Sequence, residues 1–460
     1  MSLGTIPPSI QKALELPSGY VMLVNGKPGS GKTILIQEIF RNFHKSFLVV
    51  SRMQTLSASL DGLATEIENW NDRHVLLDAH GPLFGSWAES GPLVAALSPF
   101  VNANKGLPKS DIVLIDSWSD MLGDLDPISR RKHERNIMQA AREEGKKLVI
   151  VVEDSHEIPA ESELRHRADA IVTLEKCRAD QKVYRRLTIE KMRSLPVNQD
   201  RFLFTLHEGR FTFIPWHEHI YPPIMVEREP IRDPSQGKIS TGNKSLDALI
   251  GGGFQKGTLN LVEVGDLGAP YLETIYIPFL SNHLQLGRPA VVLLPEGWSS
   301  ESFTEGLCHF VDKEPVSNLV VFFGRHILGT GTNVRAVDSD PTKTLQEMKY
   351  EAHQLEKKSG SEATQLFSLD TIENTYGPAS ARAMVAELSA SLSGTGRVTV
   401  AILGRHQAMK AQSIPHDMHL RVRRLCGVLS ISGVMPRTNF LALKPLLTEG
   451  FLDYELTPIV

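Results

Sequence analysis

Three features are scarce in this sequence of 460 residues: cysteine, long apolar runs and an excess of charge of one sign. The cysteines Cys177, Cys308 and Cys426 are far apart and lack metal-ligand spacing, so we expect neither a disulfide framework nor a zinc site. This use of cysteine is consistent with a protein of the reducing cytosol. No apolar run reaches the roughly 20 residues that cross a bilayer. The N-terminus lacks the basic and apolar regions of a signal peptide. We therefore expect a cytoplasmic protein with no membrane contact.

The charge balance excludes a strongly basic protein. Lys and Arg together number 49, Asp and Glu number 53, and the formal net charge is −4. This balance offers no global electrostatic reason to expect nucleic acid as a partner. Apolar residues make up 41% and charged residues 22%, as in ordinary globular proteins. The length predicts two or three domains.

The sequence contains a degenerate internal duplication. Five pairs of segments correspond in order: GYVMLVNGKPGSGKT with GTLNLVEVGDLGAPY, FLVVS with AVVLLPE, DIVLIDS with TQLFSLDT, LVIVVED with VTVAILG, and LTIEKMR with FLALKPL. Short apolar runs separated by helix-length segments are typical of buried parallel strands with crossover helices. We therefore predict an α/β protein of two tandem domains, each a mainly parallel sheet flanked by helices.

Helices and a linker follow from the same pattern. Helices are predicted over Ile34–His44, Asp126–Gly145 and Ala379–Leu392, and Gly145 is a suitable residue to end a helix. The stretch 215–238 is rich in proline and charge, which breaks helix and strand patterns. We expect a first domain of residues 1–226, a linker of 227–238 and a second domain of 239–460.

A phosphate-binding motif occurs in the first half. The segment GKPGSGKT matches GxxxxGK[ST] between an apolar strand and a helix, which is the context that gives the motif its meaning. Its backbone N–H groups and the following helix N-terminus suit the phosphates of ATP. Lys32 is expected to reach the β- and γ-phosphates, and the Thr33 hydroxyl to bind Mg²⁺. The alternative is a glycine-rich turn without chemistry. The predicted ATP-binding residues are Gly26, Lys27, Pro28, Gly29, Ser30, Gly31, Lys32 and Thr33.

Asp116 is the second candidate metal ligand. It ends the apolar run DIVLIDS, and the tip of a buried strand faces the crevice where open α/β sheets bind ligands. An aspartate there holds Mg²⁺ through water. An aspartate that caps a turn is the alternative, and the presence of Lys32 favours the metal role.

The order of these motifs resembles the RecA-type ATPases, and most of all their KaiC-like branch. The strongest marker lies in the second half, where STGNKSLDALIGGGFQKG (Ser240–Gly257) matches a segment of that family, whereas the first half keeps only PSGYVMLV. The resemblance implies two tandem RecA-like domains.

The resemblance also implies a catalytic base and an arginine finger. KaiC-like domains carry two glutamates after their second strand, and this sequence has Met53 and Gln54 there. Gln54 could orient a water, as glutamine does in some GTPases, and Glu153 is a weaker candidate. We therefore expect slow hydrolysis.

The family also inserts a Lys-x-Arg pair into the site of a neighbouring subunit, where it stabilises charge on the transferred phosphoryl group. Lys191 and Arg193 match this pair, which predicts a homo-oligomer or a contact between the two halves. Two exposed cations on an edge strand are the alternative.

The second half lacks the residues that hold a nucleotide. An ungapped match places Val264, Leu267, Ala269, Pro270 and Tyr271 on Gly26, Gly29, Gly31, Lys32 and Thr33. The phosphate-binding cation and the metal-binding hydroxyl are missing, and proline removes a backbone donor. Asp370 and Lys444 are matched to Asp116 and Lys191. We predict no ordinary Mg-ATP binding in this half.

The sequence is compatible with three functions. The leading hypothesis is a slow ATPase that acts as a regulatory or assembly factor with a protein partner. A second is a recombinase-like or DNA-repair accessory ATPase, motivated by the fold resemblance and by the basic cluster Arg421–Arg424. For this cluster and for another at Arg130–Arg135, a solvated helix face or a subunit contact is the usual role. The third is a non-catalytic scaffold stabilised by nucleotide.

Overall fold

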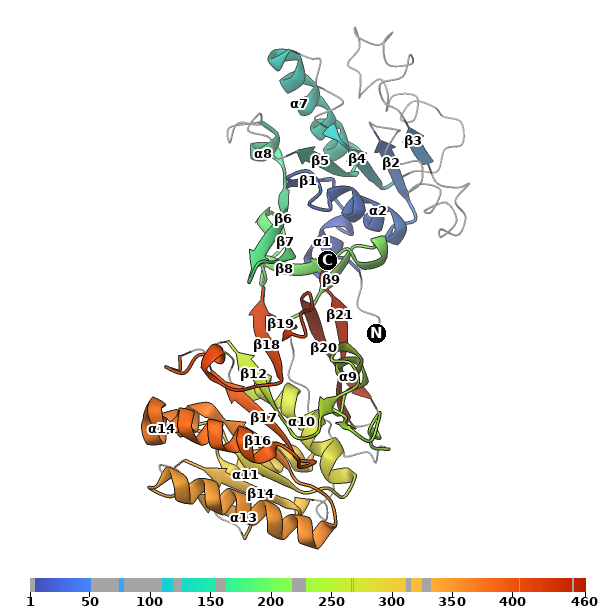
Figure 1. The fold of residues 1–460 in the computed structure, drawn as a ribbon. Helices are drawn as coiled ribbons and strands as arrows, with labels where there is room; N and C mark the ends of the chain where they lie inside the picture. Colours follow the sequence, from blue (N-terminus) through green and yellow to red (C-terminus); the bar gives the residue numbers. More distant parts are fainter. Residues whose placement is uncertain are drawn as a thin grey trace. The chain divides into compact units, whose positions relative to one another are not determined.

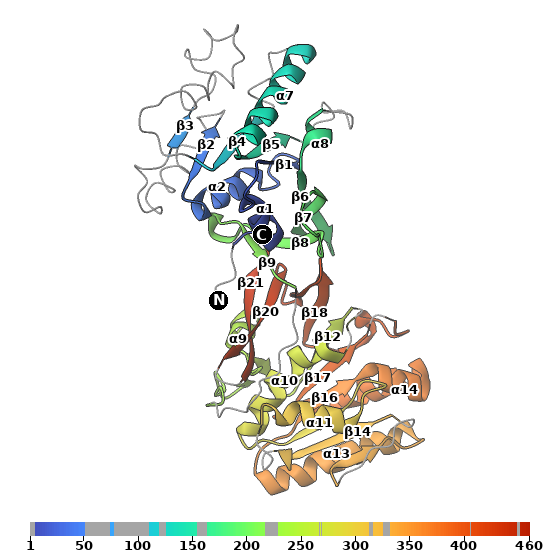
Figure 2. The ribbon, with the colours of Figure 1, turned by 180° about the vertical axis from the view of Figure 1, so that it is seen from behind.

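The computed structural model describes residues 5–50, 74–77, 110–118, 126–153, 163–216, 229–265, 267, 269–311, 316–324, 332–404, 406–448 and 451–460. The chain forms two units (Figures 1 and 2). One unit comprises Met1–Pro215 with Ile459–Val460, and the other comprises Trp216–Pro458.

The first unit is built on a sheet with the order β3-β2-β4-β5-β1-β6-β7-β8-β9. The strands from β3 to β6 pair in parallel, and β7, β8 and β9 continue the sheet in antiparallel pairs. The bounds are β1 (Tyr20–Gly26), β2 (Ser46–Val50), β3 (His74–Leu77), β4 (Ile112–Asp116), β5 (Lys147–Glu153), β6 (Ala170–Ala179), β7 (Lys182–Met192), β8 (Arg201–Thr205) and β9 (Thr212–Ile214).

Helices cover both faces of this sheet. Because side chains alternate along a strand, Met22 and Val24 of β1 join the core beneath α1 and α2, whereas Val21 and Leu23 join the core beneath α7 and α8. The helices are α1 (Pro8–Leu14), α2 (Lys32–Asn42), α7 (Pro127–Glu143) and α8 (Glu163–Arg167), with a 3₁₀ turn η2 (His207–Gly209). The parallel strands are therefore buried on both sides, as their apolar sequences predict.

The second unit has a sheet with the order β15-β14-β13-β16-β17-β12-β18-β19-β20-β21. A separate antiparallel pair joins β10 to β11. The bounds are β10 (Lys238–Ile239), β11 (Phe254–Gln255), β12 (Thr258–Val264), β13 (Ala290–Leu293), β14 (Leu319–Phe323), β15 (Val334–Ala336), β16 (Thr364–Ser368), β17 (Val398–Leu403), β18 (Met418–Leu425), β19 (Val428–Met435), β20 (Leu441–Thr448) and β21 (Phe451–Pro458).

Its helices also lie on two faces. One core joins the sheet to α9, α10 and α11, and the other joins it to α13 and α14, which lie side by side in Figure 1. The bounds are α9 (Lys244–Leu249), α10 (Ala269–Gln285), α11 (Ser300–Cys308), α13 (Pro341–Ser359) and α14 (Leu369–Leu392), with a 3₁₀ turn η3 (Ala411–Ser413). The predicted α/β class, with helix-flanked and mainly parallel sheets, is confirmed in both units.

The two sheets have corresponding strands. The central strand is β1 in the first sheet and β12 in the second. Strand β1 lies between its parallel neighbours β5 and β6, and β12 lies between its parallel neighbours β17 and β18. The antiparallel part of each sheet begins after β6 or β18. Both antiparallel parts begin with a register shift, after Ile171 in the first unit and after His419 in the second. The shared order and register support the predicted duplication.

The strand order corrects one predicted correspondence. The segment LTIEKMR lies in β7, which is antiparallel to β6, and not in a parallel strand. Its counterpart by order is β19, whereas FLALKPL lies in β20, the counterpart of β8. An apolar run indicates burial but not strand direction or neighbour, so the sequence match selected the wrong strand.

The helix predictions agree with the structure at α2 and α7, and Gly145 has the positive φ of +67° expected after a helix. Helix α14 begins ten residues earlier than predicted and is broken at Gly377, where φ is +80°. In the predicted linker, Asp233 forms an ion pair with Arg288 of the second unit. Within the described residues, no helix is both long and apolar enough to cross a membrane.

Candidate nucleotide-binding site

The glycine loop connects β1 to α2 and requires its glycines. Gly26, Gly29 and Gly31 have φ values of +151°, +71° and +109°, which residues other than glycine rarely adopt. A Cβ on Gly26 would lie 2.4 Å from the Leu174 carbonyl oxygen, and one on Gly31 would lie 3.1 Å from a Leu206 methyl group. The motif therefore has the backbone conformation that its sequence predicts.

The loop encloses a buried cation. Lys32 is 7% exposed, and its Nζ donates hydrogen bonds to the carbonyl oxygens of Gly26 (2.6 Å) and Lys27 (3.2 Å). Gly31 is the N-cap of α2 and makes no side-chain capping bond, so the helix N-terminus is suited to an anion. Ser30 Oγ is buried without a hydrogen-bond partner. A phosphate group fits this donor-rich loop.

Two acidic residues end the neighbouring strands. Asp116 is 7% exposed at the end of β4, and Glu153 is paired in register with Gly26 at the end of β5. Because parallel strands end at the same edge of a sheet, Asp116 and the loop share that edge. Thr33 lies in the first turn of α2. Hydroxyl and carboxylate oxygens are suitable Mg²⁺ ligands. Gln54, the other candidate catalytic residue, lies outside the described residues.

Lys191 and Arg193 lie away from the glycine loop of their own unit. Lys191 Nζ donates to the carbonyl oxygens of Arg165 (3.2 Å) and His166 (3.0 Å) beside α8. Arg193 accepts a hydrogen bond at its carbonyl oxygen from the Tyr20 hydroxyl (3.0 Å), and Tyr20 starts β1 whereas the loop follows its end. The length of β1 separates them by about 20 Å. Within one unit, the pair therefore does not join the loop.

The second unit fills the corresponding place with side chains. Val264, at the position of Gly26, is 5% exposed. Tyr271, at the position of Thr33, lies 5.0 Å from the Arg424 guanidinium, measured to the ring centroid, within range of a cation–π contact. Pro270 lies in the first turn of α10 and has no N–H for an anion. The loop of the second unit thus lacks the hydrogen-bond donors and the glycine positions of the first loop.

Strand register changes the predicted counterpart of Asp116 in the second unit. Ile112 and Thr364 occupy the same register relative to their central strands, so Ser368 and not Asp370 corresponds to Asp116. Asp370 instead begins α14, where its Oδ1 accepts from the Thr371 N–H (2.7 Å). The predicted equivalence of Asp370 is wrong by two residues, because an ungapped sequence match does not determine register.

A three-residue ionic cluster lies where the second loop begins. Glu263 Oε2 accepts from Arg421 Nε (2.9 Å) and Nη2 (2.7 Å) and from His419 Nε2 (2.9 Å). The His419 hydrogen bond, opposed by burial and aided by Arg421, lowers the pKa of Glu263 to about 2. Arg423 lies 5.9 Å from the Phe440 ring centroid. The arginines that motivated the DNA-binding hypothesis therefore contact neighbours within the unit.

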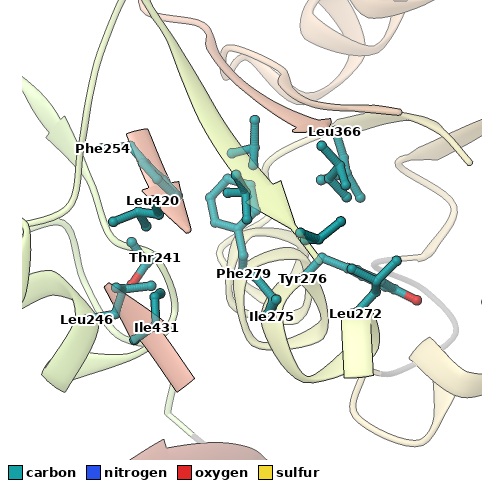
Figure 3. Close-up of a pocket in the computed structure, with 14 residues that line it drawn as sticks. Thr241, Leu246, Phe254, Leu272, Ile275, Tyr276, Phe279, Leu366, Leu420 and Ile431 are labelled. Carbon is teal, nitrogen blue, oxygen red and sulfur yellow. The ribbon is translucent and has the colours of Figure 1, made fainter. Parts of the chain in front are cut away.

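An apolar cavity of about 20 Å³ lies between α10 and the sheet of the second unit (Figure 3). Figure 3 shows Leu272, Ile275, Tyr276 and Phe279 of α10 around it. A space of this size holds about one water, and its lining is almost wholly apolar. It is a gap in the packing and too small for a nucleotide.

The Ser240–Gly257 segment has a structural role. Asp247 accepts hydrogen bonds from Ser240 Oγ (2.5 Å) and the Thr241 N–H (2.7 Å), and Asn243 Oδ1 caps α9 by accepting from the Leu246 N–H (2.7 Å). A Cβ on Gly242 would lie 2.0 Å from the Pro278 carbonyl oxygen. The hydrogen bonds fold the segment on itself, and the close approach of Gly242 to Pro278 packs it against α10.

One residue beside the first loop was missed by sequence reasoning. Arg185 of β7 donates from Nη1 to the carbonyl oxygens of Gly29 (3.0 Å) and Ser30 (3.1 Å). Nothing in the stretch KVYRRLTIE marks this arginine, because the contact exists only after the β6–β7 hairpin folds beside the loop. Within the described residues, no group of three or more His, Cys, Asp or Glu side chains could hold a metal ion.

Comparison with known proteins agrees with this geometry. Residues 13–218 match the protein family described as "ATPase: KaiC". The first unit is a KaiC-like domain of the RecA superfamily of P-loop proteins, as the motifs predict.

Two particular relatives match more of the chain. The protein GvpD2 of Halobacterium salinarum is 25% identical over 365 residues, which are 74% of this chain and 69% of that protein. The protein GvpD1 of the same organism is 26% identical over 301 residues, which are 60% of this chain and 54% of that protein. The chain thus spans about half the length of the second relative.

Proposed function

We propose that the first unit binds Mg-ATP and hydrolyses it slowly, and that the chain acts in the cytoplasm as a nucleotide-dependent regulatory or assembly factor. The observation that carries this proposal is the buried Lys32 ammonium inside the glycine loop. A buried ammonium that donates to carbonyl oxygens inside a glycine loop is suited to bind an anionic ligand. The match of residues 13–218 to KaiC ATPases supports the same conclusion.

Each residue of the site has a defined task in this proposal. The backbone N–H groups of the loop and the N-terminus of α2 receive the phosphates, and Lys32 moves its hydrogen bonds from the loop carbonyls to phosphate oxygens. Thr33 and Asp116 hold Mg²⁺, which supplies charge neutralisation at the phosphates when it is bound. Gln54 and Glu153 are the candidates to orient the attacking water.

Slow turnover and a regulatory role follow from two features. The residues after β2 include Gln54 where KaiC-like domains carry glutamate, so the attacking water has no carboxylate base there. The second unit keeps the fold but fills its loop with Val264 and Tyr271. One unit with a nucleotide site and one unit without it suit a protein whose contacts with other molecules change when nucleotide binds.

We further propose that Lys191 and Arg193 complete the site of another copy in a homo-oligomer. Their position away from the loop of their own unit supports this role, because they reach a phosphate only between copies. The DNA-binding alternative has no such support among the described residues, since Arg421, Arg423 and Arg424 contact neighbours within the unit.

Calorimetric titration with Mg-ATP tests the binding proposal. Wild type should bind, and Lys32→Ala should bind about 100-fold more weakly or not at all, because removing one partner of a buried charge pair costs about 2–5 kcal/mol. Lys12→Ala is a matched control, since Lys12 is an exposed lysine of α1 in the same unit and lies outside the predicted ATP-binding loop. It should bind within about threefold of wild type, as expected for an exposed charge. No Mg-ATP binding by wild type would overturn the proposal.

Assays of ATP turnover and DNA binding distinguish the alternatives. Turnover of ATP by wild type that is lost in Arg193→Ala, with binding retained, excludes a purely structural role for nucleotide. Salt-dependent DNA binding together with DNA-stimulated turnover would instead favour the recombinase-like function.

A further inference from the structure

Arg185 connects the β6–β7 hairpin to the glycine loop. Its Nη1 donates to the carbonyl oxygens of Gly29 (3.0 Å) and Ser30 (3.1 Å), and its Nε donates to the backbone oxygen of Val460 (2.8 Å). The guanidinium is partly buried, and this burial lowers its pKa from the ordinary arginine value. Three backbone oxygen acceptors around one rigid guanidinium define its orientation.

These contacts control the direction of the loop's peptide groups. In a trans peptide the carbonyl oxygen and the next N–H point to opposite sides. When Arg185 holds the Ser30 oxygen, the Gly31 N–H points away from the guanidinium. The Ser30 N–H is held separately, by donation to the Lys27 oxygen (3.1 Å). Both middle peptides of the loop are therefore fixed before any phosphate arrives.

Arg185 contacts the glycine loop from one face of β7. Arg185 pairs in register with Lys176 of β6, and Lys176 Nζ lies 3.0 Å from the position of a Cβ on Gly29. The next residue, Arg186, instead forms an ion pair with Glu175 at 2.7 Å, as expected when side chains alternate along a strand. Lys176 and Arg185 thus lie beside the loop, whereas the charge of Arg186 is paired with that of Glu175.

The second unit provides an internal contrast. By strand register, the counterpart of Lys176 is Arg424 and the counterpart of Arg185 is Leu429. Leu429 is fully buried and has no donor for a carbonyl oxygen. The unit whose loop has lost the phosphate-binding residues has therefore also lost the arginine beside it.

We propose that Arg185 is a positioning residue of the nucleotide site. It holds the peptides of Gly29 and Ser30 so that the Gly31 N–H is directed for phosphate binding, and it acts through the loop without touching the nucleotide. This inference rests on the proposed Mg-ATP binding by the first unit. Pre-organisation of the loop lowers the entropy that is lost when phosphate binds.

The test combines Mg-ATP titration with hydrogen exchange of the nucleotide-free protein. Arg185→Ala should bind Mg-ATP about 10- to 100-fold more weakly, the range expected for lost hydrogen bonds to a charged group. Amides of residues 27–33 should exchange faster, while those of β1 and β5 stay protected. Arg185→Lys should recover part of the affinity, since an ammonium can still donate to one carbonyl oxygen. Arg186→Ala is the matched control and should bind like wild type.

Several outcomes would overturn the inference. Equal Mg-ATP affinity in wild type and Arg185→Ala would do so, as would an equal loss in Arg186→Ala, which would indicate general damage to the hairpin. A chain that lacks Val460 separates the two sets of contacts, and a loss equal to that of Arg185→Ala would assign the effect to Val460. Absence of binding by wild type would instead overturn the proposed function. Faster loop exchange in Arg185→Ala would still show that Arg185 orders the loop.

Discussion

Replacing Glu263 by glutamine is expected to destabilise the second unit at neutral pH and not at low pH. The substitution preserves side-chain volume but removes the charge that faces Arg421 and His419. Those groups donate at 2.7–2.9 Å to one carboxylate oxygen. The prediction therefore tests whether the loop of the second unit is closed by an ionic cluster.

The magnitude and the pH range follow from the pKa of Glu263. It falls from 4.5 to about 2 in the folded protein, chiefly because His419 donates a hydrogen bond. That difference corresponds to an upper limit of roughly 3.4 kcal/mol, and the partial exposure of Glu263 reduces it to about 2 kcal/mol by solvent screening. A lowered folded pKa contributes stability above pH 4.5, and this stability is lost as the pH falls toward 2.

Urea unfolding followed by hydrogen exchange of peptides from β12 and β18 measures this effect in the second unit alone. Glu263→Gln should be less stable by about 2 kcal/mol at pH 7, and the difference should narrow below about pH 5. Glu455→Gln is the control, because Glu455 is exposed and lies 4.0 Å from Lys444, and it should cost less than about 1 kcal/mol. A Glu263→Gln defect of the same size at pH 7 and pH 3 would refute the reasoning.

The remaining predictions concern backbone strain and the contact between copies. Gly242→Ala should lower the free energy of unfolding of the second unit by more than about 2 kcal/mol. The backbone φ at Gly242 is +77°, and the new Cβ would lie 2.0 Å from the Pro278 carbonyl oxygen. Gly360→Ala, at φ +71° with open space, should cost only about 1 kcal/mol, and equal losses would contradict the steric argument. Arg193→Ala should bind Mg-ATP but not turn it over, and mixing it with Lys32→Ala should restore turnover if copies complete each other's sites. No recovery in the mixture would contradict the proposed role of Arg193 between copies.

Local sequence was sufficient for the phosphate-binding loop. Gly26–Thr33 lies between β1 and α2 as predicted, and its glycines adopt the positive φ values that only glycine tolerates easily. Asp116 ends β4 at the same edge of the sheet. These features depend on neighbours along the chain and on strand periodicity, so a single sequence contains the information.

Contacts between distant segments were not predicted. Arg185 and the glycine loop are separated by more than 150 residues in the sequence, and only the β6–β7 hairpin brings them together. The counterparts of Asp116 and Lys191 in the second unit were misassigned, because they depend on strand register and order. Periodicity reports which face of a strand is buried and carries no information on these two properties.

The sequence by itself determined that a phosphate-binding loop exists in the first half and that its counterpart in the second half lacks Lys and Thr. Both conclusions rest on residue types at fixed spacing, which folding does not alter. Only the tertiary structure decided what replaces that chemistry. The packing of α10 against the sheet brings Tyr271 beside Arg424. Register pairs Glu263 with Arg421, because pairing between strands sets which side chains meet. The same pairing placed Arg185 against the carbonyl oxygens of the first loop.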